Sequence, residues 1–225
     1  MLERLDEGLW AVTRPLKALG LTLASRMTVV RLGDGSLFLH SPVRLEPELR
    51  QALDALGPVR HLVAPNRLHH LFAGDYRTAY PQARLHGAPG VARKRPDLVL
   101  ASELGDEAPA PWAGEIDQAL IGGIPMLNEV VFHHRPSGTL ILTDLAANGG
   151  LADPLALRLW LRLNRAYGRL ATPLEVRLLC RDRAAARRGI ERALGWAFER
   201  VVVGHGAIVE GDGRRRAREA FAWLS

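Results

Sequence analysis

The apolar positions of the first 40 residues come in short blocks that are typical of β-strands. Residues 9–12, 27–32 and 36–40 each combine aliphatic or aromatic residues with few charges. Gly33-Asp34-Gly35 separates the last two blocks, and these residues tolerate the positive φ angles of a tight turn. This part of the chain therefore predicts a β-hairpin.

The middle of the chain alternates between helical and strand patterns. Residues 46–56 have helical spacing that stops at Gly57-Pro58, and the apolar run 61–64 predicts a short buried strand. Residues 87–116 are rich in Pro, Gly and Ala and predict a long irregular connection. Between these segments we expect a short helix near 75–80 and a strand near 83–86.

Strands and then helices fill the second half of the chain. We expect strands over 116–121, 128–133, 139–143 and 200–203, and helices over 154–168, 182–197 and 213–224. Strands followed by helices, twice over, are typical of two sheets packed face to face with helices outside. The pattern therefore predicts an α/β fold with a single domain over residues 1–225.

Size and composition are those of a soluble globular protein. The 225 residues are 48% hydrophobic and 24% charged, which is enough to build one sizeable core. No apolar run approaches the ~18 residues of a membrane span, and the early acidic residues argue against a signal peptide. The single cysteine, Cys180, cannot form an internal disulfide, so we expect a cytoplasmic protein.

The formal net charge of +6 is concentrated in residues 151–225, which carry 15 arginines and 8 acidic residues. Arginine supplies 28 of the 30 basic residues, an excess that GC-rich coding explains without phosphate recognition. We therefore expect a solvated basic face and no nucleic-acid partner. The partner we expect is a small-molecule substrate, which could be anionic.

Two adjacent histidines, His69 and His70, carry the strongest chemical signal. They follow the predicted strand 61–64, and Pro65 makes a helix start unfavourable there, so the pair should lie on the loop at the strand's carboxyl end. Binding crevices of open α/β sheets lie at that edge. Because imidazole is a common metal ligand, this position suggests a metal site, provided that further ligands arrive from elsewhere.

Two further candidates also follow predicted strands. Asp144 closes the strand 139–143, and His205 lies between two glycines after the strand 200–203. Each has an ordinary alternative, because a lone strand-end Asp is often a cap and Gly-His-Gly is often a turn. A His pair, an Asp and a His at strand ends in one chain nevertheless form the donor set that a transition metal requires.

This order of motifs resembles the metallo-β-lactamase-like superfamily. More narrowly, it resembles a bacterial branch known only as a domain of unknown function. The similarity implies a four-layer αββα sandwich with the metal site at one edge of the two sheets. The stretches that carry the match are 65–71, 128–137, 139–144 and 204–206.

The sequence departs from the superfamily's His-x-His-x-Asp-His motif. Aligned on the last histidine of that motif, Pro65 and Arg67 replace the first two histidines, and His69 replaces the aspartate. The third ligand of the first metal would fall near Asn128 or Glu129, where no histidine stands. The resemblance therefore implies that the first metal site is lost.

The second metal site of the superfamily survives with one change. The resemblance implies one divalent transition metal, Zn²⁺ first and Fe²⁺ second, and these ligands: His69, His70, Asp144 and His205. A bound ion of this kind lowers the pKa of water from 15.7 to about 7 and so supplies a nucleophile for hydrolysis.

Two more residues are candidates for catalysis. Glu129 is a candidate general base or a residue that orients the site, although it could simply be a polar residue at the start of a strand. Arg67 could pair with Asp144 or Glu129, or receive an anionic substrate group, or form a plain surface ion pair.

Metal-dependent hydrolysis is therefore the function that the sequence favours, with the ester, thioester, amide or phosphoester substrate left open. Iron-dependent oxidation is one alternative, because a mixed His and carboxylate set also suits non-haem iron. A binding protein without activity is another. The very apolar helix 154–168 could pack under a neighbour, form a homodimer interface or rest on an anionic membrane surface.

Overall fold

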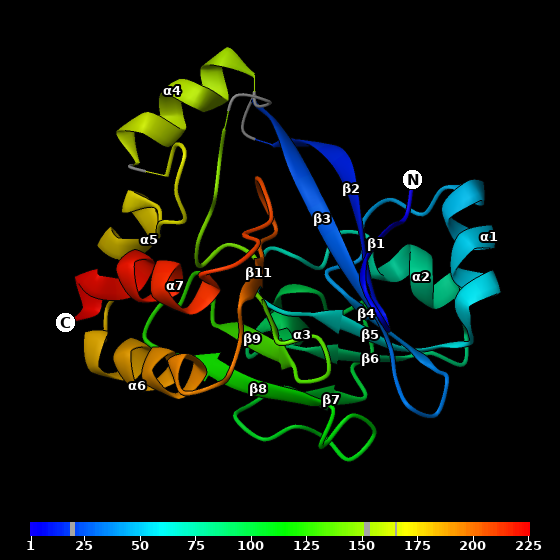
Figure 1. The fold of residues 1–225 in the computed structure, drawn as a ribbon. Coiled ribbons are helices and arrows are strands. Elements are labelled where there is room, and N and C mark those ends of the chain that lie inside the picture. Colours follow the sequence, from blue (N-terminus) through cyan, green and yellow to red (C-terminus); the bar gives the residue numbers. More distant parts are fainter. Residues whose placement is uncertain (19–20, 151–153, 165) are drawn as a thin grey trace.

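The computed structural model describes residues 1–18, 21–150, 154–164 and 166–225. The protein chain forms two β-sheets with helices on their outer faces (Figure 1). The larger sheet has its strands in sequence order: β1 (Glu3–Asp6), β2 (Leu9–Ala18), β3 (Leu21–Arg31), β4 (Leu37–His40), β5 (Val59–Ala64), β6 (Arg84–Gly87) and β7 (Ser102–Glu103). The first four strands are antiparallel neighbours, and β4 to β7 are parallel.

The smaller sheet is built from the second half of the chain. Its strand order is β11 (Arg200–Val202), β10 (Thr139–Ile141), β9 (Glu129–His134) and β8 (Ile116–Ile121). Strands β8, β9 and β10 pair antiparallel, whereas β10 and β11 run parallel. The carboxyl ends of β10 and β11 therefore lie at the same edge of this sheet, with Asp144 three positions beyond β10 and His205 three positions beyond β11.

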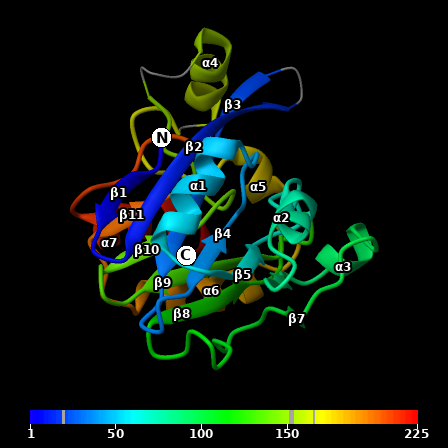
Figure 2. The same cartoon turned by 90° about the vertical axis from the view of Figure 1, so that its right-hand side faces the viewer.

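Helices cover the outer face of each sheet, as the two views show (Figures 1 and 2). Helices α1 and α2 pack on the larger sheet, and α6 and α7 pack on the smaller one. A third cluster, which includes Phe38, Trp112 and Phe132, fills the space between the sheets. The helices are α1 (Pro47–Leu56), α2 (Ala73–Ala79), α3 (Val91–Lys94), α4 (Leu155–Leu163), α5 (Leu174–Leu178), α6 (Arg183–Leu194), α7 (Gly213–Phe221) and a 3₁₀ turn, Ala222–Leu224.

These three apolar clusters confirm the expected αββα layers. Strands in the middle of the sheets present one face to the inter-sheet core and the other to the helices, so both of their faces are buried. Strand β9 is an example, because all six of its residues are buried. In the described part of the chain, no helix has the length and hydrophobicity needed to cross a bilayer.

The β2–β3 hairpin and α4 differ from the sequence prediction, and β1, β7, α3 and α5 lie where the sequence pattern predicts no strand or helix. Strands β2 and β3 form a long hairpin instead of the predicted short strands, with Pro15 paired opposite Ala24. Helix α4 ends at Leu163 instead of continuing to 168, because Tyr167 bridges to Gly149 and Gly168 adopts a φ of 70°. Position 165 of the predicted helix lies outside the described residues. The far end of the β2–β3 hairpin approaches α4 (Figure 1).

Candidate metal centre

Three side chains from separate strand ends meet at one edge of the molecule. His69 lies on the loop after β5, Asp144 follows β10, and His205 follows β11. One donor atom from each of the three lies within 4.8 Å of the other two. Their convergence places two nitrogens and one carboxylate around a common point.

The distances between these donor atoms match the spacing of ligands around a metal ion. The Nε2 atoms of His69 and His205 are 3.3 Å apart. One carboxylate oxygen of Asp144, Oδ2, lies 3.3 Å from Nε2 of His69. The other, Oδ1, lies 3.1 Å from Nε2 of His205. Ligands about 2.0–2.1 Å from a tetrahedral Zn²⁺ are about 3.3 Å from one another, so the three side chains fit such an ion.

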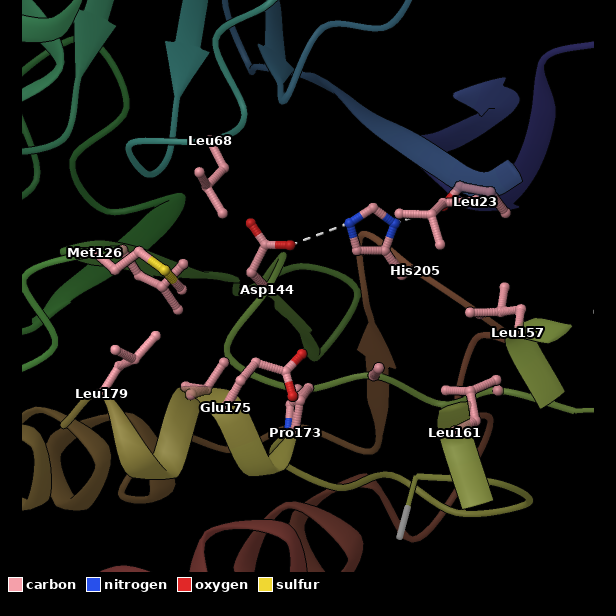
Figure 3. A pocket seen from close by; sticks show the side chains of 17 residues that line it. Leu23, Leu68, Met126, Asp144, Leu157, Leu161, Pro173, Glu175, Leu179 and His205 are labelled. Carbon is pink, nitrogen blue, oxygen red and sulfur yellow. Dashed lines mark hydrogen bonds and ion pairs between the residues drawn. The ribbon is translucent and has the colours of Figure 1, made fainter. Parts of the chain in front are cut away.

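His205 is held with a lone pair directed at the other two residues. Its Nδ1 lies 2.6 Å from the carbonyl oxygen of Ala24 on β3, and because a carbonyl can only accept, Nδ1 carries the proton. In the neutral ring, Nε2 is then an acceptor that faces the carboxylate of Asp144 (Figure 3). Two acceptors in contact require a cation or a proton between them.

His69 is oriented from the opposite side of its ring. Its Nδ1 lies 2.6 Å from the hydroxyl of Ser41, which directly follows β4 and has a φ of 58°. The hydroxyl holds the ring so that Nε2 faces Asp144 and His205. This is the arrangement in which a partner of the remote ring nitrogen fixes a metal-binding imidazole.

Asp144 is positioned by a buried polar cluster beneath it. Asn66 is fully buried, and its amide nitrogen lies 2.7 Å from the Asp144 carboxylate and 2.8 Å from that of Glu129. The amide oxygen of Asn66 accepts from the backbone N–H groups of Leu68 and His69, each at 2.8 Å. One side chain thus links the histidine loop to the aspartate.

Glu129 holds the backbone that carries Asp144. Its side chain is fully buried and accepts from the backbone N–H groups of Thr143, Asp144 and Leu145 at 2.7–3.2 Å. Burial, with the neighbouring charge of Asp144, raises the pKa of Glu129. With its oxygens occupied by these donors, Glu129 has the geometry of an orienting residue more than that of a general base.

The charges of the three residues are coupled. Burial opposes ionisation of Asp144, but the imidazoles of His69 and His205 outweigh it and lower the pKa of Asp144 well below its ordinary value. Burial likewise lowers the pKa of His205, but Asp144 outweighs it, and the net pKa of His205 is raised. The ionised carboxylate of Asp144 therefore stabilises a positive charge next to it, either protonated His205 or a metal ion.

The two glycines around His205 are required by close contacts. A Cβ on Gly204 would lie 3.2 Å from Cε1 of His69 and 3.1 Å from Cα of Thr143. Gly206 has a φ of 98°, and a Cβ there would lie 2.2 Å from the carbonyl oxygen of Asn148. Position 206 therefore requires glycine, and a side chain at position 204 would press on His69 and Thr143, so both glycines help the loop to bring His205 against the other two ligands.

His70 is not among the three converging residues. Its Nδ1 lies 3.3 Å from Nη1 of Arg95, and because a guanidinium can only donate, Nδ1 is the acceptor. Nε2 of His70 is buried and has no hydrogen-bond partner within the described chain. Burial, with Lys94 and Arg95 nearby, lowers the pKa of His70. In this tautomer the free lone pair of His70 is directed to Arg95.

Arg67 supports the histidine loop through its contacts with a neighbouring loop. Its guanidinium donates to the carbonyl of Pro125, and its backbone N–H donates to the carbonyl of Leu127 at 3.0 Å. Lys94 donates to the backbone carbonyl of Arg67 at 2.6 Å. These contacts differ from the expected ion pairs with Asp144 or Glu129, and they tie the loop that carries His69 to residues 125–127.

A cavity of about 480 Å³ opens beside the three residues (Figure 3). Asp144 and His205 form part of its wall, and Glu175 projects into it from α5. Burial, with the charge of Asp144, raises the pKa of Glu175. The remaining lining residues are apolar or glycine and come from β3, α4, the α5 segment and the loops that carry Leu68, Met126, Ala146 and Gly206. The volume lies within the roughly 300–1,000 Å³ of ligand pockets.

Solved structures with the same fold are metallo-β-lactamases. The enzyme from Pontibacter korlensis has a TM-score of 0.67 at 12% identity, with 100% of this chain and 98% of that chain covered. The enzyme from Hirschia baltica has a TM-score of 0.67 at 11% identity, with coverage of 100% and 97%. FIM-1 from Pseudomonas aeruginosa, in its mono-zinc form, has a TM-score of 0.64 at 14% identity, with coverage of 100% and 92%.

These similarities show that the chain has the metallo-β-lactamase fold over its full length. The expectation drawn from the motif order is thereby confirmed. The chain belongs to the family described as a domain of unknown function, DUF4336, whose sequence profile matches residues 6–150. A comparison with curated protein sequences gives no match.

Sequence reasoning missed two residues of the site. Asn66 lies inside the motif 65–71, and its turn-forming contacts with Leu68 and His69 are typical of asparagine directly after a strand, so its position could have indicated the role. Ser41 gave no signal beyond following a predicted strand, because its partner His69 is 28 residues away.

Proposed function

We propose that this protein is a metal-dependent hydrolase that holds one divalent transition ion, Zn²⁺ in preference to Fe²⁺. The proposed ligands are the Nε2 atoms of His69 and His205 and the carboxylate of Asp144. Three protein ligands leave a fourth tetrahedral position for water or substrate, which is the pattern of catalytic zinc sites.

One observation carries this proposal. Hydrogen bonds to Ala24 and Ser41 engage the Nδ1 atoms of both histidines, so that their Nε2 atoms face each other and Asp144 at 3.1–3.3 Å. The carboxylate of Asp144 and Nε2 of the neutral His205 ring are both acceptors, so they repel each other unless a cation or a proton lies between them. Nε2 of His69 adds a third potential ligand atom at the same point. Fold similarity adds support, since FIM-1, which shares the fold, has a mono-zinc form.

The chain's own residues prepare the site for hydrolysis. Zn²⁺ bound there would polarise a carbonyl oxygen and lower the pKa of water, supplying a nucleophile near neutral pH. Glu129 and Asn66 hold Asp144 in place, and Ser41 holds His69. Arg67 fixes the histidine loop, and the apolar cavity keeps bulk water away from the reacting group.

Metal analysis of single variants tests the ligand set. The wild-type protein should hold about one equivalent of zinc after dialysis against Zn²⁺, measured by inductively coupled plasma mass spectrometry. His69→Ala and His205→Ala should lose tenfold or more of the affinity. His70→Ala is the matched control next to His69 and should change the affinity less than threefold.

The outcomes separate the rival functions. Zinc near one equivalent, with hydrolysis that EDTA abolishes, supports the hydrolase. Iron in its place would favour oxidation chemistry, and no metal in any preparation would favour a binding protein without activity. A loss in His70→Ala equal to that in His69→Ala would restore the four-ligand set that the sequence suggested.

A further inference from the structure

We propose that the substrate is an acyl compound with an uncharged aliphatic chain, and that this chain lies in the cavity beside Asp144 and His205. This inference rests on the proposed hydrolase function for its reaction. The chain site itself rests on the shape and chemistry of the cavity, and the cavity can be tested without a metal.

The polar groups of the cavity are few. Of the 17 described residues that line it, only Asp144, Glu175 and His205 have polar side chains. Asp144 and His205 belong to the metal centre. Glu175, on α5, lies on the opposite side of the cavity from Asp144 (Figure 3). A bound molecule would therefore place its reacting polar group at the metal centre and the rest of its length along apolar wall.

The apolar wall is aliphatic. It includes Leu23 from β3, Leu68 from the histidine loop, Leu157 and Leu161 from α4, and Val176 and Leu179 at α5. Among the described lining residues there is no phenylalanine, tyrosine or tryptophan ring on which a base or sugar could stack. There is also no asparagine, glutamine, serine or threonine to read hydroxyl groups. These side chains suit methylene groups rather than a nucleotide or a carbohydrate.

The charges of the lining side chains narrow the range of possible substrates further. No arginine or lysine lines the described cavity, and two of its three polar side chains are carboxyl groups, those of Asp144 and Glu175. An anionic group inside the cavity would lack a counter-charge and would face these carboxyl groups. An ester, thioester or amide whose chain is uncharged avoids this cost along the cavity.

The mouth of the cavity is apolar as well. Leu68, Met126 and Leu179 line the cavity and are also exposed at its rim, with exposed fractions of 37%, 37% and 41%. Because the rim residues and the interior are both apolar, an aliphatic substrate chain can enter the cavity along apolar side chains. It also lets chains longer than the cavity extend over the rim.

The proposed reaction is simple hydrolysis. Water adds to the acyl carbonyl carbon, and the bond from that carbon to the leaving oxygen, sulfur or nitrogen breaks. The products are a carboxylic acid and the alcohol, thiol or amine that takes up a proton. No redox partner is required.

Binding of 1-alkanols to the EDTA-treated protein tests the chain site by calorimetry. Affinity should rise about three- to fourfold for each added methylene group from 1-butanol to 1-octanol. Leu157→Gln should weaken 1-octanol binding at least tenfold, because it places an amide in the apolar wall. The control Leu159→Gln lies on the same helix, is 58% exposed and does not line the cavity, so its effect should stay within twofold.

A second pair of variants keeps the test valid if Leu157→Gln unfolds. Leu179→Gln should weaken 1-octanol binding, whereas Leu178→Gln, at the neighbouring position with 75% exposure, should not. Absence of alkanol binding, affinity independent of chain length, or equal losses in the control variants would each overturn the chain site.

Ester hydrolysis separates this inference from the proposed function. In the zinc-loaded protein, kcat/KM for p-nitrophenyl esters should rise from acetate to octanoate, and Leu157→Gln should abolish that rise. Chain-dependent alkanol binding without hydrolysis of any ester would support the chain site and overturn the hydrolase. Hydrolysis that is equally fast for acetate and octanoate would support the hydrolase and overturn the acyl-chain substrate.

Discussion

His69 and His205 are separated by 136 positions in the sequence, yet their Nε2 atoms face each other at 3.3 Å. Each ring is held from behind, by the hydroxyl of Ser41 in one case and by the carbonyl of Ala24 in the other. The two partners come from the larger sheet, at the end of β4 and within β3, so that sheet orients both rings over the edge where Asp144 leaves the smaller sheet.

Ser41→Ala should weaken zinc binding about tenfold without removing a ligand. The hydroxyl of Ser41 is 2.6 Å from Nδ1 of His69, and loss of such a partner typically costs 10–100-fold in metal affinity. Competition with a chromogenic chelator measures the affinity. Ser137→Ala is the matched control, because Ser137 bonds Nδ1 of His134, a histidine outside the metal centre. Equal effects in both variants would contradict the orienting role of Ser41.

Asn66→Asp should destabilise the metal-free protein by roughly 2–4 kcal/mol. The substitution keeps the oxygen that accepts from Leu68 and His69, but it removes the amide donor and places a third carboxylate beside Glu129 and Asp144. Urea denaturation measures the free energy of unfolding. Asn66→Ala removes this donor and also the oxygen that accepts from Leu68 and His69, but it adds no charge, so a smaller loss in this variant would show that charge repulsion is the larger cost. If both variants lose the same amount, charge repulsion in the cluster is not the cause.

Zinc should raise the thermal stability of the wild-type protein. An ion that binds only the folded chain stabilises it by about 2.7 kcal/mol when its concentration is 100 times Kd. Differential scanning calorimetry with Zn²⁺ or with EDTA should therefore give different melting temperatures. In His205→Ala the difference should be nearly absent. A zinc effect of the same size in that variant would mean that zinc binds elsewhere.

Stability of the metal-free protein should fall between pH 7 and pH 5, in part through His134. Burial, with His133 nearby, lowers the pKa of His134 to about 4, whereas the pKa of an unfolded histidine is about 6.5. The unfolded chain therefore takes up the proton first, and the stability from the neutral folded ring is lost as the pH falls through this window. The raised pKa of His205 acts in the opposite direction.

His134→Gln isolates this contribution. Glutamine can still bond the hydroxyl of Ser137 but does not titrate, so the variant should lose roughly 1–2 kcal/mol less than the wild type between pH 7 and pH 5. Urea denaturation at both pH values, with EDTA present, provides the comparison. Parallel losses in the two proteins would show that His134 does not contribute to the acid sensitivity.

The strands and layers of this fold could be predicted because their signal is local. Buried strands such as β5 and β9 contain short apolar runs, at 62–64 and 130–132, and Gly33-Asp34-Gly35 indicates the turn before β4 directly. The outer half of the β2–β3 hairpin was missed because Pro15 and its polar neighbours do not read as a strand. Only pairing with β3 makes that segment extended.

The candidate site was predictable only in part. Their positions after predicted strands identified His69, Asp144 and His205 as candidates. A sequence alone, however, does not show which of two adjacent histidines points toward the site. The contact of His70 with Arg95 depends on α3, a helix of four residues that the sequence does not indicate. The cavity was also invisible, because its walls come from segments between Leu23 and Gly206 that only the fold brings together.

The most direct test of the metal centre is a crystal structure of the zinc-loaded protein with diffraction data collected at the zinc absorption edge. The proposal predicts one strong anomalous peak about 2.0–2.2 Å from Nε2 of His69, Nε2 of His205 and a carboxylate oxygen of Asp144. A peak bonded to His70 instead, or no peak between these three side chains at saturating zinc, would contradict it.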